Sequence, residues 1–350
     1  MKKQPLISFC ITTYNRPDFL KSIIEAILKQ KYENLEIVIS EDPSDNDSEN
    51  IVKKFNSKKI TYVKNKKKLG MTKGYNEAIY LAKGKFITLL ADDDPPTPDM
   101  IKTFLKTLEK YPQKKAFFGG SFVNITTKNI EKVTHLKKGF HSLINKEKKY
   151  GGVEILDSKT FFEKFLKQEI FPHYQWTAAV ISKDLIEKIG GVPDYNSAHF
   201  IDYAYLLKIA DISDFVIINK ELAVFALHEL SYGKKKDTLD EYKRGVLGFD
   251  KLISPLVKKY GCREEYEKFL TNYVIMFLIN RLEHYKAHKY DINPSDLVKI
   301  YQDLGKKLAF FQNRKREIYL KLNYGNAYET LDSARKIYGS AKINLLKYFK

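Results

Sequence analysis

The sequence predicts an α/β fold, in which a mixed, mostly parallel sheet is flanked by helices and followed by a C-terminal helical region. Over the first 125 residues, short runs rich in β-branched and aromatic residues alternate with longer amphipathic segments. Such alternation is typical of parallel sheets, because parallel strands are joined by crossover helices. In addition, polar and acidic residues directly follow several predicted strands, and ligands of such sheets bind at the carboxyl ends of the strands.

The first predicted strand leads into a helix that begins at Pro17, where the missing N–H group of proline is tolerated. The fourth strand, Phe-Ile-Thr-Leu-Leu, is almost entirely apolar, which indicates burial on both faces, and Pro95 and Pro96 close this segment. We expect strands at residues 6–12, 35–40, 60–63, 85–90 and 116–122. We expect the helices between them at residues 17–30, 46–55, 71–82 and 98–111.

From residue 126 to residue 155 the sequence is polar and Lys-rich with little periodicity, so we expect an insertion or a flexible excursion there. After Gly233 the pattern is helical to the end. We therefore predict a first domain over residues 1–233 and a basic, mainly helical region over residues 234–350. Further elements of the first domain are expected at residues 176–182 (strand), 183–189 (helix), 202–210 (helix), 215–218 (strand) and 223–227 (strand).

The composition is typical of a soluble globular protein with a large core, at 350 residues, 43% hydrophobic and 30% charged. The N-terminus lacks the pattern of a signal peptide. The apolar run at residues 273–279 is far shorter than the roughly 18 residues that span a bilayer. Cys10 and Cys262 lie far apart, which argues against a disulfide framework or a zinc site, and we expect a cytoplasmic protein.

The net charge of +18 raises the question of an anionic partner. Only 7 of the 61 basic residues are Arg, whereas recognition of nucleic-acid bases commonly relies on the bidentate contacts of Arg. We interpret the Lys runs at residues 66–68 and 234–236 as solvated faces and expect no nucleic-acid partner. More than half of the net charge lies in residues 234–350. Their helices could pack onto the first domain or lie on an anionic membrane.

Three adjacent carboxylates, Asp92, Asp93 and Asp94, follow the fourth predicted strand. Like charges at the end of a buried strand repel one another and lose hydration, so a compensating cation is expected. Hard oxygen ligands at this density suit Mn²⁺ or Mg²⁺, which often share their coordination shell with substrate phosphates. The alternative is a solvated acidic turn in which one Asp caps the following helix.

Polar residues at the ends of the first two strands form a second candidate site. Hydroxyl groups and an aromatic ring there could line a nucleobase pocket, at Thr12, Thr13, Tyr14 and Asn15. The carboxylate of Glu41 or Asp42 could accept the N3–H of uracil and so select a pyrimidine nucleotide. Each feature has a simpler alternative, namely a helix cap at Asn15 and an acidic turn without a ligand.

Gly70 and Asn76 precede the acidic triplet by one helix and one strand, and we assign them to the nucleotide site. No glycine-rich phosphate-binding loop of the Walker or dinucleotide type occurs in the sequence. Neutralisation of a bound diphosphate would then fall to a cation, which agrees with the acidic triplet.

Several motifs in a fixed order give the sequence a specific resemblance. They read TTYN, EDPSD, GMTKGYNEAIYLAKGKFITLLADDD with PDMI behind it, and WTAAVISKDLIEKIGGVPD. Over roughly residues 5–232 the sequence resembles the family-2-type inverting glycosyltransferases with the GT-A fold, the nucleotide-diphospho-sugar transferases. The resemblance implies a metal-dependent transfer of a sugar from a UDP-sugar to a saccharide or a lipid-linked saccharide, in the assembly of bacterial surface polysaccharides.

The resemblance also implies roles for the acidic triplet. Asp92 and Asp93 match the acidic pair of the family, whose second member usually binds the metal. Many members carry a further Asp where this chain has Leu90, so either Asp92 or Asp94 could supply the second oxygen on the metal side. His228 matches a His often found after the last strand of the domain, which could contact the metal or a phosphate; a partly buried structural His is the alternative.

Asp202 matches the general base of the family, at the start of a predicted helix. An inverting transfer needs a carboxylate that takes the proton from the acceptor hydroxyl, typically worth about 10²–10⁴ in rate. Ile201 stands where the family often has a second acid, so Asp202 alone carries the assignment; an N-terminal helix acid stabilised by the helix dipole is the alternative. Trp176 and His173 match positions that line the sugar pocket, with core packing of Trp176 as the alternative.

Within the same resemblance, Thr12, Tyr14 and one of Glu41 and Asp42 match the positions that bind the base. The implied cofactor is Mn²⁺ or Mg²⁺, and the implied partners are a nucleotide-sugar donor and a glycan acceptor. The implied location is the cytoplasm, with peripheral association at the inner face of the plasma membrane if the C-terminal helices bind lipid. Two other functions compete: a sugar nucleotidyltransferase, and a non-catalytic basic protein that binds nucleic acid or a membrane.

Overall fold

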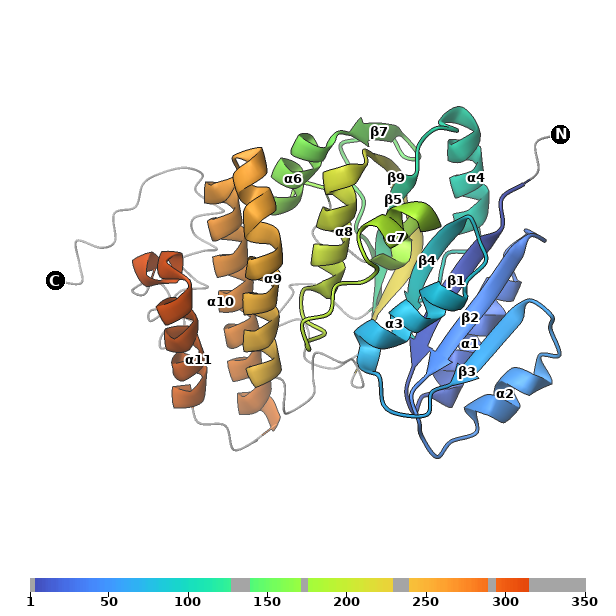
Figure 1. Ribbon diagram of the computed structural model, residues 1–350, viewed down its shortest axis with the longest axis horizontal. Helices are drawn as coiled ribbons and strands as arrows, with labels where there is room; N and C mark the ends of the chain where they lie inside the picture. The colour runs from blue at the N-terminus through green and yellow to red at the C-terminus, as the bar shows by residue number, and fades with distance from the viewer. Residues whose placement is uncertain (1–3, 127–138, 171–175, 229–238, 289–293, 315–350) are drawn as a thin grey trace. The chain divides into compact units, whose positions relative to one another are not determined.

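The computed structural model describes residues 4–126, 139–170, 176–228, 239–288 and 294–314. The chain divides into two compact units, Met1–Tyr266 and Glu267–Lys350, whose elements are shown in Figure 1. The domain boundary that we expect after residue 233 stays a prediction. The division between the two units comes later, so the long helix α9 (Leu239–Tyr260) belongs to the first unit together with the sheet.

In the described part of the chain, the first unit contains one nine-stranded sheet. Its strand order is β3-β2-β1-β4-β8-β5-β9-β7, and β6 pairs with β5 beside this path. The strands are β1 (Ile7–Thr13), β2 (Leu35–Glu41), β3 (Ile60–Lys64), β4 (Phe86–Ala91), β5 (Ala116–Ile125), β6 (Gly139–Ser142), β7 (Val153–Leu156), β8 (Ala179–Ser182) and β9 (Phe215–Leu227).

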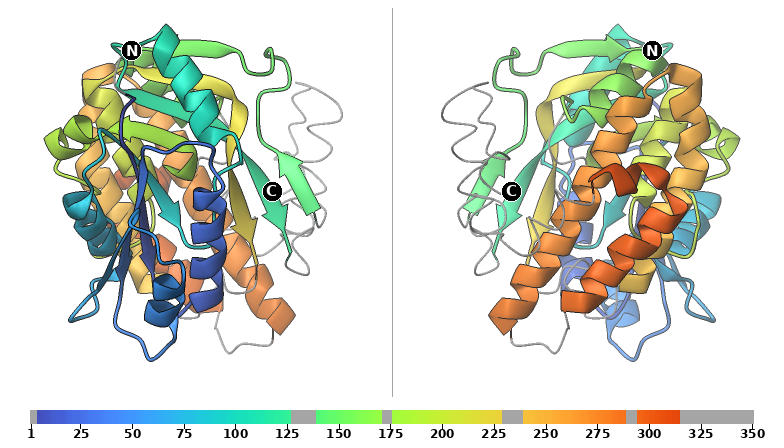
Figure 2. Two further views of the ribbon diagram at one scale, coloured as in Figure 1. Left: turned by 90° about the vertical axis from the view of Figure 1, so that its right-hand side faces the viewer. Right: turned by 90° about the vertical axis from the view of Figure 1, so that its left-hand side faces the viewer.

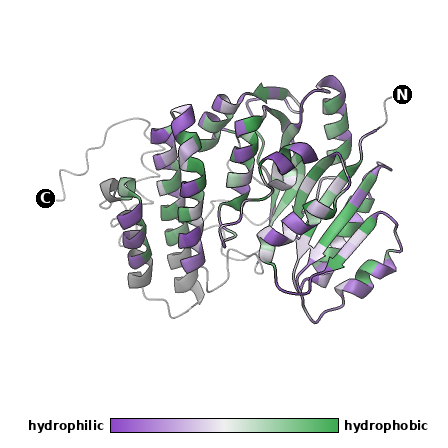
Figure 3. Cartoon of the chain, in the orientation of Figure 1, coloured by the Kyte–Doolittle hydropathy of each residue, from purple (hydrophilic) through white to green (hydrophobic). Residues whose placement is uncertain are grey.

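The first half of the sheet is parallel, as the alternating pattern predicts, since β1 pairs in parallel with β2 and with β4, and β2 with β3. The apolar residues of β1 and β4 are almost completely buried, which agrees with their mainly apolar sequences. Figure 2 shows α1 (Pro17–Leu28) and α3 (Gly70–Leu81) on opposite faces of these strands. Figure 3 shows the same strands mainly in hydrophobic colours between helices with polar outer sides.

The second half of the sheet is mixed. β8 runs antiparallel between β4 and β5, whereas β5 and β9 pair in parallel over their length. The rings of Phe86, Phe104 and Phe117 pack edge to face across this region, with centroids 5.0 to 6.2 Å apart. Each buried Phe side chain contributes about 1.5–3 kcal/mol to folding through the apolar area it removes from water. This cluster holds α4 (Met100–Lys110) against the centre of the sheet.

Three strands of the sheet differ from the prediction. The strands expected at residues 215–218 and 223–227 form one continuous strand, β9, whose register shifts opposite Gly119 and Gly120. The intervening polar residues, Lys220 and Glu221, occupy this irregularity, which explains why they look like a break in the sequence. The other two differences are β6 and β7, in the region expected to be an excursion; residues 127–138 of that region lie outside the described residues.

The remaining helices of the first unit are α2 (Ser48–Lys54), α6 (Ser158–Leu166), α7 (Lys183–Lys188) and α8 (Ile201–Ile212), with a 3₁₀ turn, η1, at Trp176–Ala178. Sequence reasoning missed α6, although Asp157 caps it by accepting a hydrogen bond from the Thr160 N–H at 2.8 Å. The signal was present, because Asp directly before an apolar periodic segment is a common helix start.

α10 (Arg263–His288) begins in the first unit and continues into the second, which also contains α11 (Pro294–Lys307) and the 3₁₀ turn η3 (Ala309–Arg314). The Tyr301 hydroxyl donates to the Phe311 carbonyl, and the two rings pack at 5.8 Å. None of the described helices combines the length and the apolar character that crossing a bilayer requires. The basic segment predicted as a last helix, residues 331–350, lies outside the described residues.

Candidate active site

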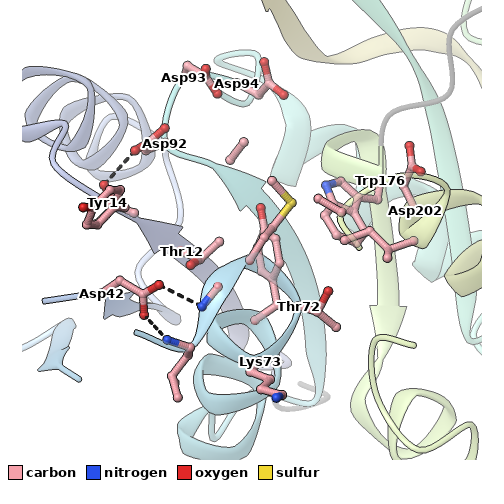
Figure 4. Close-up of a pocket in the computed structure, with 18 of the residues that line it drawn as sticks. Thr12, Tyr14, Asp42, Thr72, Lys73, Asp92, Asp93, Asp94, Trp176 and Asp202 are labelled. Atoms are coloured by element: carbon pink, nitrogen blue, oxygen red, sulfur yellow. Dashed lines mark hydrogen bonds between the residues drawn. The ribbon is translucent and has the colours of Figure 1, made fainter. Parts of the chain in front are cut away.

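The carboxyl ends of β1, β2 and β4 meet at one edge of the sheet, because all three strands run in parallel and in register. Thr12 pairs with Ser40 of β2 on one side and with Ala91 of β4 on the other. A pocket of about 620 Å³ opens at this edge, within the range that holds a nucleotide-sized ligand. Figure 4 shows part of its lining.

The pocket brings together most of the residues that the sequence singled out. Those that line it are Thr12, Thr13, Tyr14, Asp42, Gly70, Asp92, Asp93, Asp94, Trp176 and Asp202. Four others do not line it: Asn15, Glu41, Asn76 and His228. His173 lies outside the described residues.

An arginine that sequence reasoning missed holds two members of the acidic triplet. Arg16 lies at the N-cap of α1, directly after the TTYN motif, and its Nη1 atom donates to Oδ1 of Asp92 at 2.7 Å. The same nitrogen donates to Oδ2 of Asp93 at 2.8 Å. Thr13 donates to the other oxygen of Asp92 at 2.7 Å. His228 also contacts the triplet, because its Nε2 atom lies 2.9 Å from Oδ2 of Asp93.

Burial makes the ionised forms of Asp92 and Asp94 costly. Burial raises the pKa of Asp92 to about 6, and the neighbouring charge of Asp93 adds to this effect. Burial, again with Asp93, holds the pKa of Asp94 well above its usual range, although the Ala226 N–H donates to its Oδ1 at 2.8 Å. A cation near the triplet would therefore favour the charged carboxylates, as expected from the sequence.

The donor atoms fit a divalent ion that takes its other ligands from a substrate. Both oxygens of Asp92 accept hydrogen bonds, from Thr13 and Arg16, and one oxygen of Asp94 accepts from the backbone. Asp93 contacts Arg16 and His228 through Oδ2 alone, so Asp93 and His228 are the adjacent pair best placed for an ion. Among the described residues, no group of three or more His, Cys, Asp or Glu side chains could hold a metal ion by itself. Mg²⁺ sites commonly use one or two carboxylates plus substrate phosphates, so a protein pair completed by a diphosphate fits this class of ion.

Asp42 is the one of the two candidate base-binding acids that reaches the pocket. Its Oδ1 accepts the Leu69 N–H and its Oδ2 the Gly70 N–H, both at 2.8 Å, so it also shapes the start of α3. Glu41 is fully buried and directed away from the pocket, where it accepts hydrogen bonds from the side chains of Tyr62, Ser44 and Asn46. A carboxylate oxygen can accept more than one hydrogen bond, so Asp42 keeps acceptor capacity toward the pocket.

The aromatic ring at the end of β1 is accessible to a ligand. Tyr14 is 44% exposed, and the ammonium group of Lys68 lies 4.7 Å from its ring centroid. Thr12 beneath it is contacted by α3, because a Cβ atom added to Gly74 would stand 2.5 Å from the Thr12 Oγ1 atom. Glycine at position 74 therefore allows α3 to approach the end of β1.

The side chain of Asn76 is bonded to the protein backbone and does not line the pocket. Its side-chain amide donates to the Val192 carbonyl at 3.0 Å, and its side-chain oxygen accepts the Val192 N–H at 2.8 Å. These two bonds tie α3 to the segment after Gly191, where a Cβ atom would stand 2.4 Å from the Asn76 Oδ1 atom. The assignment of Asn76 to the nucleotide is therefore not supported by the position of its side chain.

The opposite side of the pocket carries Trp176 and Asp202, as Figure 4 shows. The Trp176 ring packs edge-on against Tyr75 with centroids 4.7 Å apart. Asp202 lies in the first turn of α8, and its Oδ1 accepts the Tyr203 N–H at 2.9 Å. Burial raises the pKa of Asp202 to about 6 despite this hydrogen bond. Glu241 of α9 also lines this side of the pocket, which the sequence did not indicate.

A protein-family model matches the N-terminal part of the chain. The model described as "Glycosyl transferase family 2" matches residues 8–190.

Two curated relatives carry specific names. The UDP-Glc:alpha-D-GlcNAc-diphosphoundecaprenol beta-1,3-glucosyltransferase WfaP of Escherichia coli is 33% identical over 116 residues, which cover 33% of this chain and 45% of the relative. The GalNAc(5)-diNAcBac-PP-undecaprenol beta-1,3-glucosyltransferase of Campylobacter jejuni is 27% identical over 180 residues, or 47% and 57% of the two chains. The chain spans about two fifths of the length of several curated relatives that it matches.

Solved structures show the same fold at low sequence identity. Residues 1–349 of TarS from S. aureus, in complex with UDP-GlcNAc, match with a TM-score of 0.52 and 13% identity over 93% of this chain and 92% of that one. The mannosyltransferase PcManGT from Pyrobaculum calidifontis, in complex with GDP-Man and Mn²⁺, matches with a TM-score of 0.50 and 17% identity over 93% and 88%. The chain thus has the GT-A-like α/β fold of these proteins.

Proposed function

The chain belongs to glycosyl transferase family 2, and on this premise we propose that it is a metal-dependent, inverting glycosyltransferase that uses a UDP-sugar. One observation carries the proposal: a single pocket has the acidic triplet on one side and Asp202 on the other. A donor whose diphosphate lies at Asp92–Asp94 would then present its sugar toward Asp202. Attack from the Asp202 side, with diphosphate leaving toward the triplet, inverts the configuration at the sugar carbon.

The uridine would bind at the ends of β1 and β2. The Asp42 carboxylate can accept the N3–H of uracil, and the exposed ring of Tyr14 offers a face on which the base can stack. Cytosine lacks a hydrogen at N3, so the same carboxylate disfavours it. We therefore expect tighter binding of UDP than of CDP.

Asp93 and His228 would hold the divalent ion, Mn²⁺ or Mg²⁺, whose charge would stabilise the leaving diphosphate. Arg16 is placed to donate to the diphosphate, because its guanidinium group already contacts both Asp92 and Asp93. Together these groups supply the positive charge that, in other nucleotide sites, comes from a glycine-rich loop and a helix N-terminus.

Asp202 would act as the general base. It would take the proton from the acceptor hydroxyl as the oxygen attacks the sugar carbon. Its raised pKa of about 6 leaves it ionised at neutral pH, and a base with a pKa close to the working pH is efficient. Trp176, which is buried in the wall of the pocket at 6% exposure, would line the sugar site on the same side.

The acceptor is proposed as a saccharide or a lipid-linked saccharide in surface-glycan assembly. Its support is that the names of two relatives specify sugars linked to undecaprenyl diphosphate. Such an acceptor would bring the protein to the cytoplasmic face of a membrane, where the basic C-terminal region could bind anionic lipid. Removal of residues 331–350 should then shift the protein from the membrane to the soluble fraction; unchanged partitioning would reject lipid binding by this segment.

A UDP-release assay tests the proposal. Purified protein is incubated with UDP-glucose, UDP-galactose or UDP-N-acetylglucosamine, with Mn²⁺ or with EDTA, and free UDP is measured. We expect slow, Mn²⁺-dependent hydrolysis of one donor, and loss of this hydrolysis in Asp93→Asn and Asp202→Asn. Absence of UDP release from all donors, together with UDP binding that neither Mn²⁺ nor Asp93→Asn affects, would reject the proposal.

A further inference from the structure

The segment that leads into α8, residues 194–200, is held by one face of α9. Glu241 accepts the Ala198 N–H on its Oε1 atom at 2.9 Å. One turn further along the helix, Arg244 donates from its Nε atom to the Asn196 carbonyl at 3.3 Å. Figure 1 shows α9 beside α8, and α9 lies beyond residues 8–190 that match the family model.

Two glycines bring the backbone of α9 against this segment. A Cβ atom on Gly245 would stand 2.7 Å from the Ser197 Oγ atom and 2.8 Å from the Cβ of His199. A Cβ atom on Gly248 would stand 2.4 Å from the ring of Tyr195. Real Cβ atoms do not approach other atoms this closely, so a side chain at either position would displace the segment.

The same segment contains a strained residue next to α8. Phe200 has φ +65°, the left-handed region that a bulky side chain rarely adopts. Such a conformation is strained and persists only where surrounding contacts impose it. Its ring packs against Phe249 at 5.2 Å and Tyr242 at 5.7 Å, both on α9. Asp202 follows two residues later, so the conformation of Phe200 sets where α8 begins.

We propose that α9 is a positioning element of the active site, in which Glu241, Gly245 and Gly248 hold residues 194–200 so that Asp202 faces the pocket. The inference rests on the proposed function of Asp202 as the base. Glu241 acts through the Ala198 N–H and not by contact with the reacting atoms.

Amide hydrogen exchange tests the positioning without any assumption about substrate. In the full chain, Glu241→Ala should speed exchange in the peptide containing residues 194–202 about tenfold, the effect of losing one charge-assisted hydrogen bond. Gly248→Ala should speed the same exchange because the added Cβ atom displaces Tyr195. Glu241→Gln should leave this exchange nearly unchanged, because its amide oxygen still accepts from Ala198. Asp240→Ala, which removes an exposed acid from the same turn, is the matched control and should change nothing. Unchanged exchange in both Glu241→Ala and Gly248→Ala would overturn the inference.

Turnover separates positioning from a general loss of folding. With the UDP-sugar that wild type hydrolyses, Glu241→Ala and Gly248→Ala should lower kcat about tenfold or more at an unchanged affinity for UDP, and Glu241→Gln should restore kcat to within about threefold. An equal loss in Glu241→Gln and Glu241→Ala would overturn the inference, since charge and not the contact with Ala198 would then matter. If wild type releases no UDP, the proposed function fails, and the exchange experiment still decides whether α9 holds the segment.

Discussion

The Nη1 atom of Arg16 lies 2.8 Å from Oδ2 of Asp93, the oxygen that also faces His228. This oxygen is therefore shared between an arginine at the start of α1 and the residue pair that would hold a divalent ion. The arginine and the ion would compete for it, and a diphosphate would provide the arginine with another partner. The contact between Arg16 and Asp93 thus connects metal binding to the position of the Arg16 side chain.

Replacing Arg16 by Gln should reveal this relationship in the stability of the protein. The substitution leaves partly buried carboxylates without their cation, so the free energy of unfolding should fall by about 1–3 kcal/mol. Mn²⁺ should restore more stability to the variant than it adds to wild type. Urea unfolding with and without Mn²⁺ measures both effects, with Lys21→Gln on the exposed side of α1 as control. Equal Mn²⁺ effects in both proteins would show that Arg16 and the ion do not share Asp93.

The pH dependence of turnover should have an acidic limb near pH 6. Burial raises the pKa of Asp202 to about 6, and a base must be ionised to accept a proton, so kcat should fall as the pH drops through this value. The pKa of Asp92 is also raised to about 6, but a bound cation favours its charged form. A limb that stays near pH 6 at saturating Mn²⁺ therefore belongs to Asp202. A limb below pH 5 under these conditions would contradict the assignment.

Asp202→Asn should gain stability while it loses turnover. The folded-state pKa of about 6 lies above the usual value of 3.8, so folding favours the protonated form. The cost of the ionised form is absent below about pH 4 and is fully present above about pH 6 to 7. The variant should consequently exceed wild type by about 3 kcal/mol at pH 8 and match it at pH 4. Unfolding curves at the two pH values provide the test. A variant less stable than wild type at pH 8 would show that the ionised form of Asp202 does not destabilise the folded protein.

Tyr75→Phe should also stabilise the protein. The Tyr75 side chain is fully buried beside the pocket, and among the described residues its hydroxyl has no hydrogen-bond partner. Removing a buried unsatisfied hydroxyl should add about 1 kcal/mol, or roughly 2–4 °C in Tm. The matched control is Tyr266→Phe. The Tyr266 hydroxyl donates to Asp250 at 2.9 Å, so its removal should destabilise the protein. A lower Tm for Tyr75→Phe would mean that the hydroxyl has a partner such as an ordered water.

The sequence predicted the parallel half of the fold because burial and local pattern agree there. The strand that ends at Ala91, directly before Asp92, is apolar except for Thr88, and Pro17 begins α1 as expected. β6 and β7 were missed because four-residue strands leave no periodicity to recognise, and β7 contains the charged Glu154. Their pairing depends on β5 and β9, which are distant in sequence.

The site was predictable where chemistry follows directly from strand ends, and less so where it depends on side-chain direction. Glu41 and Asp42 are adjacent, so one must face away from the pocket, and sequence alone does not say which. Asn76 matches a motif but bonds to Val192, 116 residues away. Glu241 reaches the pocket through tertiary packing of α9, for which the sequence offers no local sign.

Trp176 is the only tryptophan in the sequence, and it lines the pocket against Tyr75. Indole emission from this protein therefore arises at a single place, in the wall of the pocket. Its intensity or wavelength can report occupancy in a titration, free of any label or coupled enzyme. Trp176 is therefore an intrinsic fluorescence probe for ligand screening.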